Sequence, residues 1–136
     1  MHGLIDLPAS LEPTAEALTH ATSRVTDRIS SALHSDLPQV NALCERLESY
    51  RGKMLRPVLA TLSATAAAGE HALQSSPDVD TLAATVEAIH LATLVHDDVL
   101  DEADTRRGSP TISSLTTNET AVILGDYCIA AAYHLC

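Results

Sequence analysis

Five stretches of this sequence repeat apolar residues at helical spacing, and this periodicity constrains the fold more than any other feature. In the first stretch, Val25, Ile29 and Leu33 recur at intervals of four residues. Helices joined by short loops pack as antiparallel neighbours, so we expect an all-α bundle of about five helices. The expected helices cover residues 11–33, 38–50, 57–68, 79–100 and 118–135.

The composition agrees with a helical core. The chain contains no Phe and no Trp, although hydrophobic residues make up 46% of it. The core must therefore consist mainly of aliphatic side chains, among which alanine and leucine are strong helix formers. A length of 136 residues suits one domain over residues 1–136.

Capping residues, proline and glycine mark the expected helix ends. Ser10 can cap the first helix, and either Asp78 or Asp80 can cap the fourth. Pro57 fits the first turn of the third helix, and Gly69 fits its end. The sequence therefore leaves residues 1–9 as a lead-in and residues 70–77 as a connector.

The apolar patterns also predict which helices are covered. The third helix is small and apolar, so we expect it to be buried on most sides. The last helix is hydrophobic nearly all round, so it needs cover on all faces, from the four preceding helices, from more chain or from a partner. The apolar stripe expected on the fourth helix consists of Leu82, Val86, Ile89, Thr93 and Val95.

The formal net charge of −10 argues against two classes of partner. Nucleic-acid backbones and anionic membrane surfaces both attract basic proteins, so we expect neither. No run of about 18 apolar residues indicates a transmembrane segment. The three cysteines lack a metal-ligand spacing, which favours reduced core thiols and a soluble, cytoplasmic protein.

Three carboxylates cluster at the end of the fourth helix. Asp97 and Asp101 are four residues apart and share one helix face, while Asp98 is turned about 100° around the axis. Such carboxylates repel one another unless a cation lies between them, and Mg²⁺ with phosphate oxygens suits this role. A solvated acidic helix end is the alternative, although acidic residues oppose the helix dipole at this end.

Two pairs of basic residues accompany the acidic cluster. Lys53 and Arg56 flank one loop, and Arg106 and Arg107 are adjacent in another. Two basic clusters beside one acidic cluster suit two phosphorylated ligands, one held through a metal and one held directly by cations. Ordinary surface charge is the alternative for either pair alone.

Two further titratable residues precede the acidic cluster on the same helix. His90 is seven residues before Asp97, about two turns away on the same face. A lone histidine on an apolar helix is commonly a hydrogen-bonded core residue, and this alternative also applies to His96. Glu87 is a candidate buried carboxylate and would then need a hydrogen-bonding partner.

Three motifs in order resemble one family. The stretch from Glu87 to Gly108, EAIHLATLVHDDVLDEADTRRG, resembles the first aspartate-rich region of the trans-isoprenyl diphosphate synthases, the polyprenyl synthetase family. GKMLRP at residues 52–57 resembles that family's GKxxRP motif, and AVILGDY at residues 121–127 resembles the helix that follows the metal site. The resemblance extends from about residue 10 to the end, and it implies the N-terminal half of the isoprenoid synthase fold.

The resemblance also implies roles for individual residues. The three aspartates, Asp97, Asp98 and Asp101, would bind Mg²⁺ that holds an allylic prenyl diphosphate, and Arg106 would support the same diphosphate. The family reaction is ionisation of the allylic C–O bond, attack by the double bond of isopentenyl diphosphate, and loss of a proton. The residues that would hold isopentenyl diphosphate are Lys53, Arg56, His90 and Arg107.

The helix before the cluster would form a wall of the product tunnel. Ala92 matches a position where short-chain members of the family often carry an aromatic residue, and Thr93 and Ile89 add no aromatic bulk. We therefore expect a medium or long polyprenyl product, and a shorter one when Ala92 is replaced by Phe in a full-length enzyme.

Family members are longer and carry a second aspartate-rich motif, whereas this sequence contains one. We therefore expect the 136 residues not to catalyse prenyl transfer alone. Three explanations are open: a partial product of a synthase gene, one half of a heteromeric synthase, or a non-catalytic partner or regulatory subunit that binds metal or diphosphate. The resemblance also implies pairing, so we expect a homodimer, or a heteromer with a chain that supplies the second aspartate-rich motif.

Overall fold

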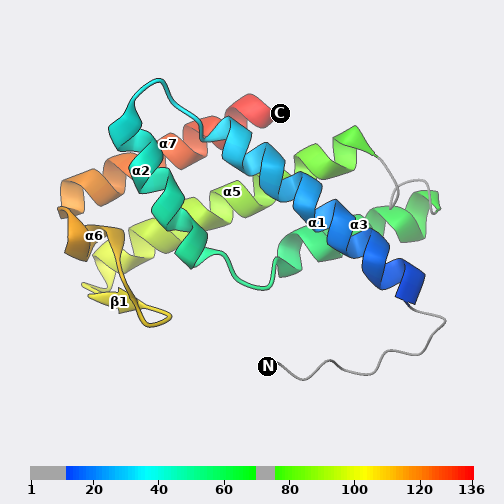
Figure 1. The fold of residues 1–136 in the computed structure, drawn as a ribbon, viewed down its shortest axis with the longest axis horizontal. Helices are drawn as coiled ribbons and strands as arrows, with labels where there is room; N and C mark the ends of the chain where they lie inside the picture. Colours follow the sequence, from blue (N-terminus) through cyan, green and yellow to red (C-terminus); the bar gives the residue numbers. More distant parts are fainter. Residues whose placement is uncertain (1–11, 70–75) are drawn as a thin grey trace.

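The structure is a computed structural model that describes residues 12–69 and 76–136, and it confirms the all-α class (Figure 1). The expected lead-in, the Ser10 cap and most of the connector lie outside the described residues. The helices are α1 (Glu12–Ala32), α2 (Pro38–Arg46), the 3-10 helix η1 (Leu47–Tyr50), α3 (Leu55–Ala68), α5 (Pro77–Leu100), α6 (Ile112–Leu115) and α7 (Asn118–Leu135). Two short strands, β1 (Thr105–Arg106) and β2 (Ser109–Pro110), pair antiparallel.

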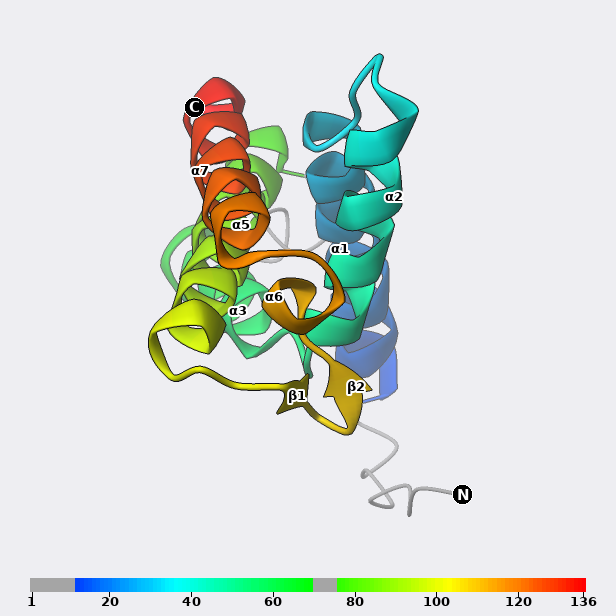
Figure 2. The ribbon, with the colours of Figure 1, turned by 90° about the vertical axis from the view of Figure 1, so that its left-hand side faces the viewer.

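Helix α5 is the central element of the fold. It packs against α7, α3 and α1, and its C-terminal end lies beside the β1–β2 hairpin (Figure 1). Seen from the end, α1 and α2 lie on one side of the molecule, α5 and α7 on the other, and α6 between them (Figure 2). The core side chains include Val25 and Ile29 of α1, Leu91 and Val95 of α5, and Leu124 of α7. Full burial of each such side chain contributes about 1.5–3 kcal/mol.

The cap expected for α5 is wrong. The helix begins at Pro77, and Ser76 occupies the N-cap position without a side-chain hydrogen bond. Asp80 is 4% exposed, and its Oδ2 accepts a hydrogen bond from Arg24 Nε at 2.7 Å. This carboxylate therefore joins α5 to α1, because a buried charge needs a charged partner more than the helix end needs a cap.

The cover expected for α3 is also wrong, and the apolar stripe expected on α5 is mostly exposed. Of the α3 side chains, Pro57 and Thr61 are buried, whereas Leu59 is 62% exposed. On α5 the stripe of larger residues is mostly exposed, with Leu82 at 57% and Ile89 at 42%. The buried face of α5 is rich in alanine, which lets neighbouring helices approach closely and leaves the bulkier stripe outside.

The β1–β2 hairpin is an element that the helical periodicity does not predict. Arg107 and Gly108 form its turn, with φ angles of 52° and 81°. Two successive positive φ angles define the type I′ turn that two-residue hairpin loops favour, and glycine adopts this conformation at no steric cost. The turn fixes Arg106 opposite Ser109, so Arg106 leaves the hairpin in a defined direction.

Candidate functional site

The three aspartates at the end of α5 do not converge on one point. Asp97 and Asp101 are exposed, and the Asp101 N–H donates to Asp97 O at 2.8 Å, so helical geometry continues between them. The two exposed carboxylates therefore lie one turn apart on one face. Asp98 is 2% exposed and lies among the packed helices.

Asp98 is paired with Arg106 of β1. Arg106 Nε donates to Asp98 Oδ1 at 2.8 Å, and Arg106 Nη2 lies 2.7 Å from the same oxygen. The second carboxylate oxygen, Oδ2, is buried and has no hydrogen-bond partner among the described residues. The hydrogen bond to Asp98 raises the pKa of Arg106 above its ordinary value, so this guanidinium stays charged.

Tyr50 also contacts the Arg106 side chain. The sequence patterns do not identify Tyr50 as a site residue. Its side chain is almost fully buried, and the Arg106 guanidinium lies over its ring, with Cζ 5.8 Å from the ring centroid. The Tyr50 hydroxyl accepts a hydrogen bond from the Ile112 N–H at 3.0 Å. Burial, and then the neighbouring Asp98 carboxylate, raise the pKa of Tyr50 to about 12, so the phenol stays neutral.

The two basic loops meet through Arg107. Its Nη1 donates to Arg51 O at 2.8 Å, which ties the hairpin to the loop before α3. A Cβ added at Gly52 would lie 2.7 Å from Arg107 Nη2, so the absence of a side chain there allows this approach. Residues more than 50 positions apart in the sequence are thereby held together.

Burial and nearby positive charges both act on the pKa of His90. Burial lowers the pKa of this half-buried imidazole below its ordinary value of 6.5. The positive charges of three nearby arginines lower it further, and these are Arg56, Arg106 and Arg107. His90 is therefore neutral at pH 7 and lies beside a group of cations.

Glu87 is the buried carboxylate that the sequence suggested. It is 3% exposed, and its Oε2 has no hydrogen-bond partner in the described part of the chain. Burial raises the pKa of Glu87, while the charges of Arg56, Arg51 and Arg107 act in the opposite direction. Glu87 thus lies close to the same arginines as His90.

The structure places most of the predicted cations in one region. Arg106 and Arg107 lie in the hairpin, and Arg107 contacts the loop before Arg56. The charges of these three arginines lower the pKa of His90. Lys53 is exposed and follows Gly52, the residue against which Arg107 packs. Among the described residues Lys53 has no hydrogen bond or ion pair, so its place in the loop alone puts it in this neighbourhood.

The three residues expected to form a product wall lie in two different environments. Ile89 is 42% exposed and Thr93 is also exposed, one turn further along α5. Ala92 is fully buried within the core cluster. An added side chain at Ala92 would meet the packed interior of this chain, whereas one at Thr93 would extend from the exposed face.

The carboxylates at the end of α5 suit a metal ion whose remaining ligands are water molecules and phosphate oxygens. Among residues 12–69 and 76–136, no three histidine, cysteine, aspartate or glutamate side chains are grouped so that they could hold an ion by themselves. Magnesium is usually held by one or two carboxylates together with waters and phosphate oxygens. The exposed pair Asp97 and Asp101 fits that requirement, whereas Asp98 is committed to Arg106.

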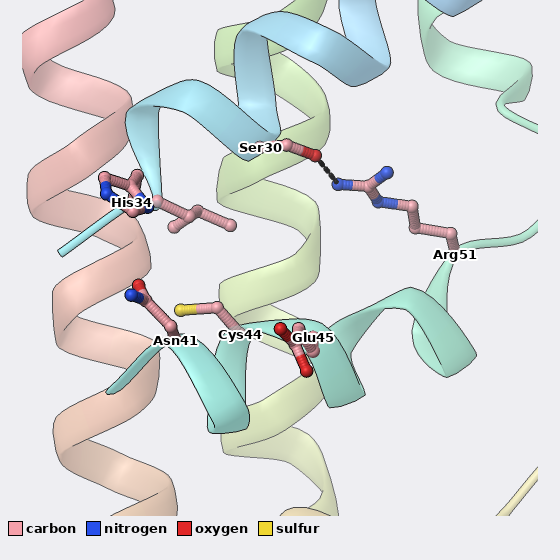
Figure 3. Close-up of a pocket in the computed structure, with 7 residues that line it drawn as sticks. Ser30, His34, Asn41, Cys44, Glu45 and Arg51 are labelled. Carbon is pink, nitrogen blue, oxygen red and sulfur yellow. Dashed lines mark hydrogen bonds between the residues drawn. The ribbon is translucent and has the colours of Figure 1, made fainter. Parts of the chain in front are cut away.

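A separate polar pocket of about 170 Å³ lies between α1 and the α2–η1 segment (Figure 3). An Arg51 Nη2 donor bonds Ser30 Oγ across it at 3.3 Å. Half-buried Cys44 also lines it, and burial raises the pKa of this thiol. None of the site residues predicted from the sequence lines this pocket.

The cationic region at the end of α5 suits an anionic ligand with several oxygens. Guanidinium groups bind phosphate oxygens through charge-assisted hydrogen bonds, and the exposed carboxylates accept a divalent cation. None of the described helices is long and apolar enough to cross a bilayer.

Comparisons with known proteins identify the family of this chain. A polyprenyl synthetase family model matches residues 37–136. The chain is 40% identical over 107 residues to an all-trans-nonaprenyl-diphosphate synthase, geranyl-diphosphate specific, of Rhodobacter capsulatus. That match covers 79% of this chain and 32% of the relative, so the chain spans about a third of the relative's length.

Solved structures share the fold. A decaprenyl diphosphate synthase from Rhodobacter capsulatus superposes with a TM-score of 0.77 at 39% identity, covering 89% of this chain and 36% of that one. A polyprenyl synthase from Caulobacter crescentus, complexed with calcium and isoprenyl diphosphate, gives a TM-score of 0.75 at 34% identity. That match covers 88% of this chain and 36% of the other.

Proposed function

The chain belongs to the polyprenyl synthetase family, and from this premise we propose that it supplies the first diphosphate-binding wall of a trans-prenyl diphosphate synthase. The reaction would join an allylic prenyl diphosphate to isopentenyl diphosphate. One observation carries the proposal: the exposed Asp97–Asp101 pair lies at the end of the helix that carries His90. The β1–β2 hairpin that carries Arg106 and Arg107 contacts the loop before Arg56, and all three arginine charges act on His90.

The carboxylates and Arg106 would hold the allylic diphosphate. Asp97 and Asp101 would bind Mg²⁺, which when bound neutralises the charge that develops on a departing diphosphate. Calcium and an isoprenyl diphosphate in the Caulobacter crescentus relative support this pairing of ligand and cation. Asp98 would act through Arg106, because its Oδ1 is already bonded to that guanidinium.

The remaining cations would hold isopentenyl diphosphate. Arg107 and Arg56 carry fixed charge, and Lys53 adds a mobile ammonium group from the loop that Arg107 contacts. His90 is neutral in the free chain and would donate one hydrogen bond. These residues would fix the orientation of the substrate and leave its double bond toward the allylic carbon.

The exposed stripe of α5 would form an apolar wall that excludes water from the reacting carbocation. Ile89 and Thr93 lie on this face. The absence of aromatic side chains at these two positions agrees with a medium or long polyprenyl product. In an active complex we expect Thr93→Phe to shorten the product, and Thr93→Ser, the matched control, to leave its length unchanged.

Co-expression with a chain that carries a second aspartate-rich motif tests the proposal. Incorporation of radiolabelled isopentenyl diphosphate should require both chains and should fall about 100-fold or more in the double variant Asp97→Asn, Asp101→Asn. An exposed acid on α1 provides a matched control, because Glu16→Gln removes a charge far along the sequence from the motif.

A second candidate function is a non-catalytic partner subunit. The exposed apolar side chains of α3 and α5 favour this function, since Leu59 and Leu82 could be buried by contact with another chain. The same assay separates the two functions. Incorporation that needs this chain but is unchanged in the double aspartate variant would establish the partner and overturn the catalytic proposal.

A further inference from the structure

Tyr50 connects three segments that meet at the proposed diphosphate site. It ends η1, its ring lies under the guanidinium of Arg106 in β1, and its hydroxyl accepts the N–H of Ile112 at the start of α6. The side chain is 2% exposed, so few alternative positions are open to it. None of the sequence motifs or proposed substrate contacts includes this residue.

The Arg106 guanidinium is held by the groups around its side chain. It belongs to a strand of two residues, and its side chain is 24% exposed. Asp98 holds one edge of the guanidinium through Nε and Nη2. Within the described residues, the third nitrogen, Nη1, has no hydrogen bond and is free to meet an anion.

We propose that Tyr50 is a positioning residue of the diphosphate site, which holds the Arg106 guanidinium over its ring so that Nη1 is presented to the ligand. Asp98 fixes the guanidinium along one edge, and Tyr50 fixes its plane. The Ile112 N–H in turn fixes the phenol. The proposal rests on the proposed function, because it assigns the ligand of Arg106 as a diphosphate.

The ring and the hydroxyl have separable roles. Tyr50→Phe keeps the ring under Arg106 but removes the acceptor for Ile112, so it should lower the melting temperature and change diphosphate affinity by less than about twofold. Tyr50→Leu removes the ring. A cation–π contact at a partly exposed site is worth about 1 kcal/mol, so this variant should weaken affinity about fivefold.

A double-mutant cycle tests whether Tyr50 acts through Arg106. Affinity of the full 136-residue chain for inorganic pyrophosphate with Mg²⁺ would be measured by calorimetry, with Tyr50→Leu alone, Arg106→Ala alone and both together. We expect the effect of Tyr50→Leu to vanish in the Arg106→Ala background. An equal loss in both backgrounds, or no loss in either, would overturn the inference.

Tyr127→Leu is the matched control. Tyr127 is half-buried, and its hydroxyl donates to the backbone oxygen of Leu33 at 3.2 Å, so the variant also loses a ring and a backbone hydrogen bond. It should lower stability without changing pyrophosphate affinity. A change in affinity as large as that of Tyr50→Leu would show that Tyr50→Leu reports a general loss of structure, and the inference would fail.

Nuclear magnetic resonance of the wild-type chain tests the positioning without any variant. The Arg106 δ-methylene protons should be shifted upfield by the Tyr50 ring, and its Nε–H should exchange slowly with water. Unshifted, rapidly exchanging signals would overturn the inference. Pyrophosphate binding that is lost in the double variant Asp97→Asn, Asp101→Asn but unaffected by Tyr50→Leu would also overturn the inference, and it would leave the proposed function intact. The absence of pyrophosphate binding by the wild type would overturn the proposed function itself.

Discussion

Adjacent carboxylates have different environments at the end of α5. Asp97 is exposed, whereas Asp98 is buried and bonded to Arg106. The helix rotation of about 100° per residue produces this difference, because it turns one side chain to solvent and the next to the packed hairpin. A metal bound at this end would therefore meet Asp97 and Asp101 first.

Glu87 leads to a prediction for pH dependence. Its pKa is raised by burial above the ordinary value of 4.5, so the folded chain binds its proton more tightly than the unfolded chain does. Stability from this group is therefore present at pH values below 4.5 and is lost as the pH rises from there through the raised pKa. We expect Glu87→Gln to reduce that decline.

Urea unfolding of the wild type and Glu87→Gln between pH 4 and pH 8 measures this effect. Exposed Glu16→Gln serves as the control, because it removes a carboxylate that packing does not cover. Parallel curves of unfolding free energy for the wild type and Glu87→Gln would contradict the assignment of a raised pKa.

At the scale of single elements, the close contact between α5 and α7 depends on Gly125. A Cβ built there would lie 2.1 Å from His96 Nε2, and that imidazole also lies 3.1 Å from Val122 O, to which it donates. Gly125→Ala must displace the ring and break this bond. We expect a loss of about 1–3 kcal/mol in unfolding free energy.

Chemical unfolding of Gly125→Ala measures the loss. Ala130→Gly, on an exposed face of the same helix, controls for intrinsic propensity, because it should cost about 1 kcal/mol without any steric contact. Wild-type stability in Gly125→Ala would show that α5 and α7 do not approach as closely as described.

The two faces of α5 give a third prediction. Ala92 is fully buried in the core cluster, whereas neighbouring Thr93 is exposed. Ala92→Phe should overpack the core and cost about 1–3 kcal/mol or more, while Thr93→Phe should change stability by less than about 0.5 kcal/mol. Thermal unfolding of both variants checks this, and equal losses would contradict the assigned faces.

Helix positions followed from the sequence more closely than helix faces did. The apolar spacing placed the last helix at residues 118–135, where α7 lies. The apolar stripe of α5 is mostly exposed, because periodicity identifies an apolar face but not which of two apolar faces is covered. Alanines at positions 83, 84, 88 and 92 form the buried face, and their small size makes them weak signals of burial.

The charged residues of the site could be predicted from the sequence, but the residues that position them could not. The motif residues Asp97, Arg106 and Arg107 stand out by charge and spacing. Tyr50 does not, because its role depends on a hairpin that is 55 residues or more away in the sequence. Only the folded chain shows that its ring lies under Arg106.

On the scale of the whole molecule, the proposed site is assembled from distant segments. The loop before α3, the end of α5 and the hairpin after it each contribute a charged side chain, and the middle of α5 contributes His90. The hydrogen bond from Arg107 to Arg51 and the approach to Gly52 join the first of these segments to the last. Correct folding of the 136 residues is therefore a condition for binding a diphosphate.

Calorimetric titration of the full chain with inorganic pyrophosphate, with and without Mg²⁺, tests the central claim most directly. Binding should require Mg²⁺, and the double variant Asp97→Asn, Asp101→Asn should weaken it at least about tenfold, whereas Glu16→Gln should leave it unchanged. Binding that is equally strong without Mg²⁺, or that is unaffected by the two aspartate changes, would contradict the claim.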